Sequence, residues 1–383
     1  MRTSISRLAA GTLVVLAACT GSPSPTSPSD GTSGSTSAPP STSGIARLAD
    51  GQPLPTGCPT GTAAPDETVA FVADGNAWVL DPSSGDVSCL FAAPTPGPFT
   101  WNPRGDRALL NDLEIRSIHG VQLRAASPPP AAVTSWGHPI GKAVVYVSPS
   151  GSRLRKIHPG TQRRDDITPV AHVHYLNVIY HPSGLAIAFV IDTGDGEEIW
   201  LSSNLGEDPV RLVFAVGGTR FGALDFTADG TTLLYAAVHG DDAPLLHAID
   251  LTNPTINQGL WHGDAADRIS TIAAQPDPDG DLIALTVGAT CEDSRAMVFR
   301  RGEQPQPLAD APSRIVGWLD GSTVLVATGG CDGPSNRVAI DSGQAVAVPL
   351  VTGIEIAAAR TPLSGFVPPL PAGIEEAVGG GVG

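Results

Sequence analysis

Two histidines separated by one residue, His172 and His174 in the segment AHVHYL, are the first candidates for chemistry in this sequence. Residues i and i+2 of a β-strand project from the same face, so the two imidazoles could together hold a metal ion or a small ligand. In the alternative interpretation the strand lines a water-filled channel and both rings are merely hydrated. The sequence favours this second interpretation and keeps the two histidines as ligand candidates.

Three carboxylates, Asp192, Asp195 and Glu197, lie close together in the segment IDTGDGEEIW and are the second candidates, in this case for a cation. Their spacing lacks the alternating oxygen ligands of an EF-hand loop. A solvated hairpin loop between two apolar runs explains the same residues, and it also explains the acidic segment HGDDAP at 239–244. We therefore expect no cofactor and no bound metal.

The N-terminus has the composition of an export signal. Arg2 and Arg7 precede an apolar run from Leu8 to Ala18, which is too short for a membrane span of about 20 residues. The residues LAAC, ending at Cys19, resemble the lipobox of bacterial lipoproteins. This resemblance implies a signal peptide at 1–18, a diacylglycerol on the Cys19 sulfur, and cleavage that leaves Cys19 as the new N-terminus.

The residues after Cys19 are nearly all Ser, Thr, Pro and Gly as far as Gly44, with one charge at Asp30. Such a segment has too few apolar side chains to offset the entropy lost on ordering. We expect a disordered tether over 19–66, which would hold the folded part away from the membrane.

Four cysteines remain after Cys19, an even number that suits disulfides in an oxidising compartment: Cys58, Cys89, Cys291 and Cys331. Three pairings are possible. We favour Cys58 with Cys89 and Cys291 with Cys331, because each pair is close in sequence. Metal ligation is the alternative, but the sequence has no CxxC spacing to support it.

The chain is acidic, with 22 basic and 38 acidic side chains and a formal net charge of −16. This charge makes nucleic acid and anionic lipid poor partners. The 44 glycines and 36 prolines separate short runs of Val, Ile, Leu and aromatic residues. That pattern is typical of an all-β fold.

A turn ending in glycine recurs every 36 to 50 residues, and each turn is followed by an apolar run: the glycines are Gly105, Gly141, Gly184, Gly230, Gly280 and Gly321. Such a period predicts one small antiparallel sheet per repeat, as in a β-propeller at 67–365. The segment GIEIAAARTPLSG near the C-terminus lacks a full repeat after it. We expect it to supply the innermost strand of the N-terminal blade, giving seven blades, with six as the alternative, and a flexible Gly/Pro-rich tail at 366–383.

The segment from Tyr180 to Trp200, YHPSGLAIAFVIDTGDGEEIW, resembles the WD40-like repeat of the TolB-like propeller family. The shared order is an aromatic residue, a turn ending in glycine, an apolar strand, an acidic loop and a second strand. The resemblance covers about residues 67 to 365 and implies the propeller fold. No N-terminal α/β domain of the TolB type precedes it, so a TolB-like role in envelope transport does not follow.

Together these features predict a lipid-anchored, extracytoplasmic propeller that acts as a binding or scaffold module in a bacterial cell envelope. We expect a monomer that binds an envelope protein or a small ligand at one face. The anchor would lie in the outer leaflet of the cytoplasmic membrane if the bacterium is Gram-positive. The alternatives are a propeller hydrolase or lyase acting on an envelope or extracellular polymer, and an accessory protein of a membrane sensor. No Gly-x-Ser-x-Gly motif or paired acids single out a catalytic site, so the sequence favours a non-enzymatic role.

Overall fold

The described part of the computed structural model contains twenty-eight short strands and one helical turn. All of them belong to the unit Ser43–Gly383. The signal peptide, Cys19, Cys291 and Cys331 lie outside the described residues. The residues that the structure describes are 53–55, 57–58, 68–92, 99–102, 106–110, 114–117, 122–124, 132–137, 143–158, 161, 163–214, 217–264, 267–288, 290, 292–309, 312–328, 335–339, 345–347, 357–359 and 367–375.

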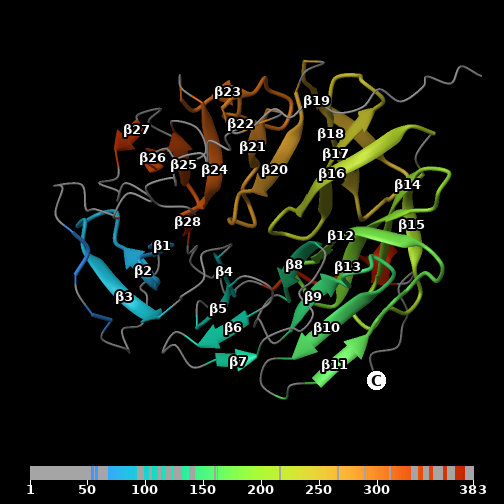
Figure 1. Cartoon of the computed structure of the whole chain (residues 1–383). Coiled ribbons are helices and arrows are strands. Elements are labelled where there is room, and N and C mark those ends of the chain that lie inside the picture. Colours follow the sequence, from blue (N-terminus) through green and yellow to red (C-terminus); the bar gives the residue numbers. More distant parts are fainter. Residues whose placement is uncertain are drawn as a thin grey trace, which may run out of the picture. The chain divides into compact units, whose positions relative to one another are not determined.

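The described strands pair into seven antiparallel sheets of four strands each, numbered here in chain order (Figure 1). Sheet 1 contains β28 (Ala357–Ala359), β1 (Val69–Ala73), β2 (Asn76–Leu80) and β3 (Val87–Ala92). Sheet 2 contains β4 (Phe99–Trp101), β5 (Arg107–Leu110), β6 (Glu114–Ser117) and β7 (Gln122–Arg124). Sheet 3 contains β8 (Ala132–Trp136), β9 (Val144–Val147), β10 (Leu154–His158) and β11 (Arg163–Asp166).

The other four sheets follow the same meander order. Sheet 4 contains β12 (His174–Tyr180), β13 (Ala186–Asp192), β14 (Glu197–Ser203) and β15 (Val210–Phe214). Sheet 5 contains β16 (Thr219–Phe226), β17 (Thr232–His239), β18 (Leu245–Asp250) and β19 (Asn257–His262). Sheet 6 contains β20 (Ile269–Ala274), β21 (Leu282–Val287), β22 (Arg295–Arg300) and β23 (Gln306–Pro307). Sheet 7 contains β24 (Ser313–Trp318), β25 (Thr323–Thr328), β26 (Ser335–Ala339) and β27 (Ala345–Ala347).

Clusters of buried side chains join each sheet to the next and close the ring. Phe189 of sheet 4 packs with Val147 of sheet 3, and Leu325 of sheet 7 packs with Phe71 of sheet 1. Equivalent clusters fill the five remaining junctions. A single sheet cannot bury both of its faces, but sheets stacked in a ring cover one another. The prediction of an all-β propeller is therefore confirmed.

The sizes of the sheets correct the predicted number of blades. Five sheets are full-size blades, each with at least three strands of five or more residues: sheets 1, 4, 5, 6 and 7. The strands of sheets 2 and 3 contain only three to five residues. Residues 93–143 carry eight prolines, each of which lacks the N–H that a strand ladder needs. In place of seven blades, or six, the described residues build five full-size blades and two reduced four-stranded sheets.

The first strand of sheet 1 comes from the far end of the chain. β28 pairs antiparallel with β1, and Val69 lies opposite Ala359. In sheets 4 to 7 the corresponding edge position is held by the first strand of the repeat. The pairing of β28 with β1 therefore joins residues near the two ends of the unit in one sheet.

A buried histidine in the repeat turn ties sheet 4 to sheet 5. The backbone N–H of Ser183 donates to His181 Nδ1 (3.1 Å), so Nε2 carries the ring proton and donates to the carbonyl oxygen of Gly230 (2.8 Å). Gln275 Nε2 donates in the same way to the carbonyl of Gly321, between sheets 6 and 7. His181 is fully buried, so this Ser–His pair is part of the framework and is not available as a nucleophile.

Part of the segment predicted as a disordered tether, 19–66, belongs to the folded unit instead. Leu54 is buried with Phe71 and Leu319, and Cys58 forms a disulfide with Cys89 of β3. This disulfide confirms the first of the two predicted pairings. The second pairing lies outside the described residues.

We expect the double variant Cys58→Ser, Cys89→Ser to lose about 3 to 4 kcal/mol of unfolding free energy. The bond spans 31 residues, and in the chain-entropy model a loop of that size restricts the unfolded chain by this amount. Urea unfolding at 25 °C measures the change, with Ser88→Ala at the exposed neighbouring position as the control. Equal stability of the double variant and the control would contradict the prediction.

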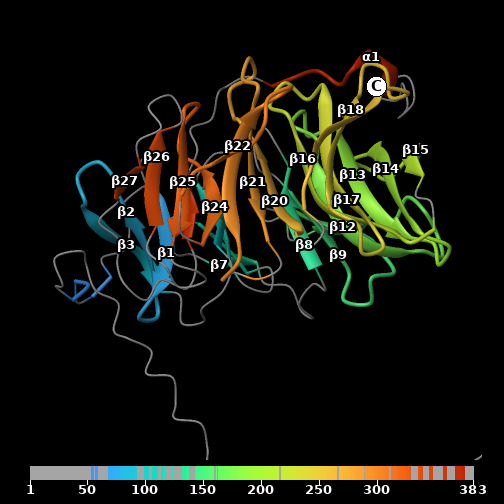
Figure 2. The ribbon, with the colours of Figure 1, turned by 90° about the horizontal axis from the view of Figure 1, so that it is seen from above.

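The C-terminal residues differ from the flexible tail predicted for 366–383. The short helix α1 (Ala372–Glu375) lies beside sheets 4 and 5 in Figure 2. Ile374 is fully buried in the cluster that joins these two sheets, next to Leu370. Pro368 is buried as well. Apolar side chains at suitable positions thus anchor 367–375, in spite of the Gly/Pro-rich composition around them.

Within the described ranges, no helix combines the length and apolar character needed to cross a membrane.

Candidate functional site

The structure does not place the two histidine candidates on one strand face. His174 is the first residue of β12, and its ring packs directly on Gly151. His172 precedes the strand, with a φ of 63° that turns the chain away from the extended conformation. Both side chains are exposed. The i, i+2 argument fails here because strand β12 begins two residues later than the pattern predicted.

The three carboxylate candidates lie on the hairpin between β13 and β14, as the repeat pattern predicted. Asp192 Oδ1 accepts the backbone N–H of Gly194 (2.7 Å), while Asp195 is exposed in the turn. Glu197 Oε2 accepts the backbone N–H of Phe221 in sheet 5 (2.6 Å), and burial raises the pKa of Glu197. Among the described residues, no group of three or more His, Cys, Asp or Glu side chains is arranged to hold a metal ion.

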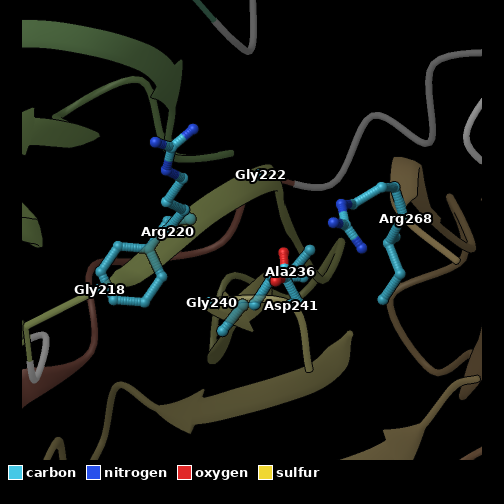
Figure 3. A pocket seen from close by; sticks show the side chains of 11 residues that line it. Gly218, Arg220, Gly222, Ala236, Gly240, Asp241 and Arg268 are labelled. Atoms are coloured by element: carbon cyan, nitrogen blue, oxygen red, sulfur yellow. The ribbon is translucent and has the colours of Figure 1, made fainter. Parts of the chain in front are cut away.

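A cavity of about 520 Å³ lies near Glu197, between sheets 5 and 6. Its walls come from the start of β16, the end of β17, the loop after β17 and the residues that lead into β20 (Figure 3). Apolar side chains, including Phe221, Val238 and Ile269, form part of the wall. Its charged side chains are Arg220, Arg268 and Asp241.

Two guanidinium groups give this cavity its positive charge. Arg220 and Arg268 are exposed, and neither forms an ion pair with a carboxylate of the described residues. Among the described residues, Arg268 Nη1 donates to the carbonyl oxygen of Asp267 (2.7 Å), while Arg295 Nη2 donates to the Asp267 carboxylate (2.7 Å). Asp241, on the loop after β17, is the single carboxylate of the lining. The cavity therefore has an excess positive charge in a chain whose net charge is −16.

Neighbouring strands fix the backbone under the cavity. β16 has a β-bulge between Phe221 and Leu224, which changes the direction of the side chains before it. From sheet 4, Asn177 Nδ2 donates to the carbonyl oxygen of Gly222 (3.3 Å), and Glu197 holds the N–H of Phe221. Glu197 thus positions the strand that carries Arg220, a structural role in place of the cation site considered from the sequence.

The arginines of this cavity were not predicted from the sequence. Arg220 and Arg268 are 48 residues apart, close to the repeat length, and each directly precedes the apolar run of an innermost strand. Comparison of the repeats at that position, in addition to their glycine turns, could have identified them.

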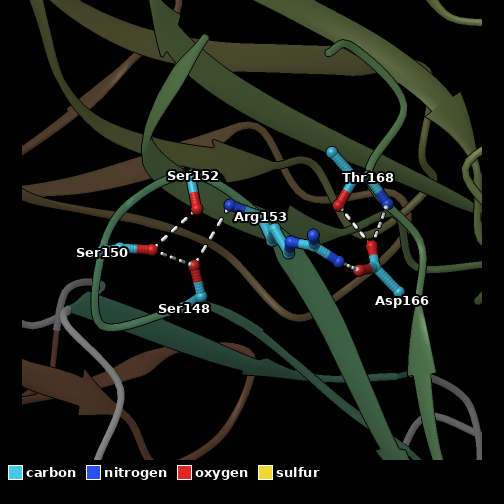
Figure 4. Close-up of polar contacts among 6 residues, drawn as sticks. All are labelled: Ser148, Ser150, Ser152, Arg153, Asp166 and Thr168. Carbon is cyan, nitrogen blue, oxygen red and sulfur yellow. Dashed lines mark hydrogen bonds and ion pairs between the residues drawn. The ribbon is translucent and has the colours of Figure 1, made fainter. Parts of the chain in front are cut away.

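A second polar cluster lies on sheet 3 and has a structural explanation (Figure 4). Arg153 pairs with Asp166 (2.5 Å), and its backbone N–H donates to Ser148 Oγ (3.1 Å). Burial opposes ionisation of Asp166, but hydrogen bonds from Thr168 and Arg153 prevail and lower the pKa of this carboxyl. The hydroxyls of Ser148, Ser150 and Ser152 hydrogen-bond in a chain. The hydrogen-bonding groups of this cluster pair with one another, so the cluster stabilises a hairpin of sheet 3.

Comparisons of the sequence with protein-family models and with curated proteins found no match. Comparison of the structure found many solved β-propellers. One is an oligogalacturonate lyase from Vibrio parahaemolyticus, 12% identical, with a TM-score of 0.52 over 74% of this chain and 84% of the lyase. Another is a prolyl endopeptidase, 12% identical, with a TM-score of 0.56 over 76% of this chain and 50% of that chain. TolB from Acinetobacter baumannii is also similar, 15% identical, with a TM-score of 0.46 over 76% of this chain and 81% of TolB.

At these identities the similarity to the lyase and the endopeptidase shows the fold alone. The strand pairing and these neighbours define the described unit as a β-propeller, a class in which function depends on the residues of particular sites and not on the fold. The cavity between sheets 5 and 6 is therefore the basis for the functional argument.

Proposed function

We propose that this protein is a lipid-anchored, extracytoplasmic β-propeller that binds a protein or a ligand as a scaffold module of a bacterial cell envelope. The lipobox-like residues before Cys19 support the anchor, and the rigid ring of sheets supports the binding role. A ring with loops at its faces presents binding residues on a fixed frame. We propose that the protein is a monomer and that its lipid lies in the outer leaflet of the cytoplasmic membrane if the bacterium is Gram-positive.

The observation that carries the binding role is the cavity between sheets 5 and 6. It has the volume of a small-molecule site, apolar walls and two guanidinium groups without ion-pair partners among the described residues. The acidic net charge of the chain makes nucleic acid a poor partner. The cavity therefore supports the proposal that this face of the ring is the binding face.

A lyase or hydrolase is the alternative function, because one of the similar structures is an oligogalacturonate lyase. Converging acids and histidines at one mouth of the channel would favour it, and the described residues do not bring three such groups together as a metal site. An accessory protein of a membrane sensor is the second alternative. A membrane kinase captured through the propeller would favour this last role.

The variant Cys19→Ala should release the protein from membranes, since a thioether-linked diacylglycerol is the proposed attachment. Fractionation of cells that produce the variant, together with an alkyne fatty-acid label, measures the change. The control is Ser22→Ala, three residues further along the proposed tether. Membrane retention of Cys19→Ala without acyl label would contradict the anchor.

Affinity capture from intact, crosslinked cells tests the binding role. We expect wild-type protein to enrich a specific partner or ligand, and the double variant Arg220→Glu, Arg268→Glu to lose it, because the charge of the cavity is then reversed. The control is Arg153→Glu, which changes a surface charge on sheet 3. Equal capture by all three proteins would contradict a binding function for this face.

A further inference from the structure

Three innermost strands carry an arginine at the same place. Arg220 of β16, Arg268 directly before β20 and Arg314 of β24 are 48 and 46 residues apart. Each is followed at once by an apolar residue that packs into a junction between sheets: Phe221, Ile269 and Ile315. The repeat therefore places a cation at an equivalent position in sheets 5, 6 and 7.

The strand register supports this equivalence. Phe221 lies opposite Ala237 of β17, and Ile315 lies opposite Val326 of β25. The carbonyl oxygen of Arg268 accepts the N–H of Gly288, which extends the ladder of β20 and β21 by one step. A bulge follows the arginine in all three strands. Since the three strands start at the same edge of their sheets, the arginines lie at one mouth of the propeller.

The described arginines divide into those paired with a carboxylate and those without such a pair within the described residues, a group that includes Arg220, Arg268 and Arg314 together with Arg107, Arg155, Arg164 and Arg301. Five arginines of the described residues form ion pairs with carboxylates: Arg153, Arg163, Arg211, Arg295 and Arg300. Arg220, Arg268 and Arg314 form no such pair within the described residues. β16, β20 and β24 belong to successive sheets, and like charges gathered at one mouth repel one another. Arg220 is also attracted to Glu197, whose pKa is raised by burial and lowered by Arg220. An anion supplied from outside would neutralise the charges of the three arginines.

We propose that Arg220, Arg268 and Arg314 form one binding site for a small organic anion that carries at least two carboxylate or phosphate groups. The inference rests on the proposed binding function, assigns a ligand class to the cavity that Arg220 and Arg268 line, and extends the site to Arg314 of the next sheet. A guanidinium group binds carboxylate and phosphate through two parallel hydrogen bonds, which suits an acidic group on each arginine. Phe221, Val238 and Ile269 provide an apolar wall for the carbon skeleton.

Asp241 refines the chemistry of the ligand. Its carboxylate lies between Arg220 and Arg268 in the view of Figure 3. A carboxylate at this position accepts a hydrogen bond from a hydroxyl or ammonium group of the ligand. A hydroxylated polycarboxylate supplies both this hydroxyl group and the acidic groups for the arginines. Citrate is a suitable probe, pyrophosphate tests phosphate, and acetate serves as the monovalent control.

Isothermal titration of the full lipidated chain in neutral detergent at low ionic strength tests the site. We expect citrate to bind at one site per chain, acetate not to bind, and the citrate affinity to fall as salt rises. Arg220→Gln, Arg268→Gln and Arg314→Gln should each weaken citrate binding about tenfold or more. The matched control Arg300→Gln, which removes an exposed arginine paired with Asp281, should change it less than about twofold.

Absence of citrate and pyrophosphate binding would overturn the inference, as would equal weakening by Arg300→Gln, which would indicate diffuse surface attraction. Full binding by Arg314→Gln would overturn the three-arginine site. Melting temperatures of all variants check that they fold. Citrate and pyrophosphate could fail to bind while capture from cells still depends on the cavity. That result would overturn the small-anion inference but leave the proposed binding function standing, because the site would then bind a different partner.

Discussion

Replacing Gly230 by alanine is expected to lower the free energy of unfolding by about 4 kcal/mol or more. Gly230 has a φ of +70°, and an added Cβ would lie 2.6 Å from His181 Cε1 and Nε2. The substitution combines backbone strain with overpacking, each of which costs about 1 to 3 kcal/mol. It also displaces the His181 ring from the Gly230 carbonyl, which weakens a buried hydrogen bond between sheets 4 and 5.

Gly194→Ala is the matched control for this prediction. Gly194 has a φ of +86°, but nothing lies within 4 Å of an added Cβ. This variant should therefore show the backbone cost alone, about 1 kcal/mol. Urea unfolding of both variants separates the two contributions. If Gly230→Ala and Gly194→Ala were equally stable, His181 would not link the two sheets as described.

The Asp225→Asn variant should abolish a loss of stability that wild-type protein suffers as pH rises. Asp225 lies on the innermost strand of sheet 5, and its oxygens accept the N–H groups of Ala274 (2.8 Å) and Phe226 (2.9 Å). Burial raises the pKa of Asp225 to about 7, although both hydrogen bonds act in the opposite direction. The folded state thus holds a proton that the unfolded chain, with an ordinary pKa of 3.8, releases earlier.

The sign of the pH effect follows from this difference. Below pH 3.8 both states are protonated, and the favourable contribution of the protonated group is complete. Between pH 4 and 7 the folded state binds more protons, so stability falls as pH rises and levels off above about pH 7. The difference between the pKa of Asp225 in the folded and unfolded states corresponds to a change of at most about 4 kcal/mol in the free energy of unfolding. Relative to wild type, Asp225→Asn should gain stability by up to that amount between pH 4 and 8.

Asp229→Asn provides a control of opposite sign in the same sheet. Burial opposes ionisation of Asp229, but hydrogen bonds from Thr227 and Thr231 prevail and lower its pKa. Asp229→Asn should therefore lose stability relative to wild type as pH rises towards about 4, with no further change above the unfolded pKa of 3.8. Urea unfolding at intervals from about pH 2 to 8 compares both variants with wild type. Parallel pH curves for wild type and Asp225→Asn would contradict the assignment.

The fold could be predicted well because its signals are local and repeated. The turn at His181–Gly184 and the apolar run after it show the start of a sheet without any knowledge of distant residues. Cys58 and Cys89 could be paired because they are close in sequence. Blade size was less accessible, since the lengths of the strands in sheets 2 and 3 depend on prolines and on packing against neighbours.

The candidate site could not be predicted in the same way, because it depends on contacts between repeats. Glu197 looks like a cation ligand in the sequence, but in the structure it holds the N–H of Phe221, 24 residues away in the next sheet. His172 and His174 fit a strand pattern in the sequence, but β12 begins at His174, two residues too late to include His172. Whether an arginine has a carboxylate partner is also invisible in the sequence, as the contrast of Arg268 with Arg295 illustrates.

Site-specific photo-crosslinking in living cells tests the central claim most directly, namely that the cavity face is the binding face. A crosslinking residue replaces Asp241 at the cavity in one variant and Asp279, at the opposite end of the innermost strand of sheet 6, in the other. Both aspartates are exposed. We predict a specific crosslinked product with Asp241 that Arg268→Glu removes, and none with Asp279. Products of equal yield at both positions, or a product at Asp279 alone, would contradict this account.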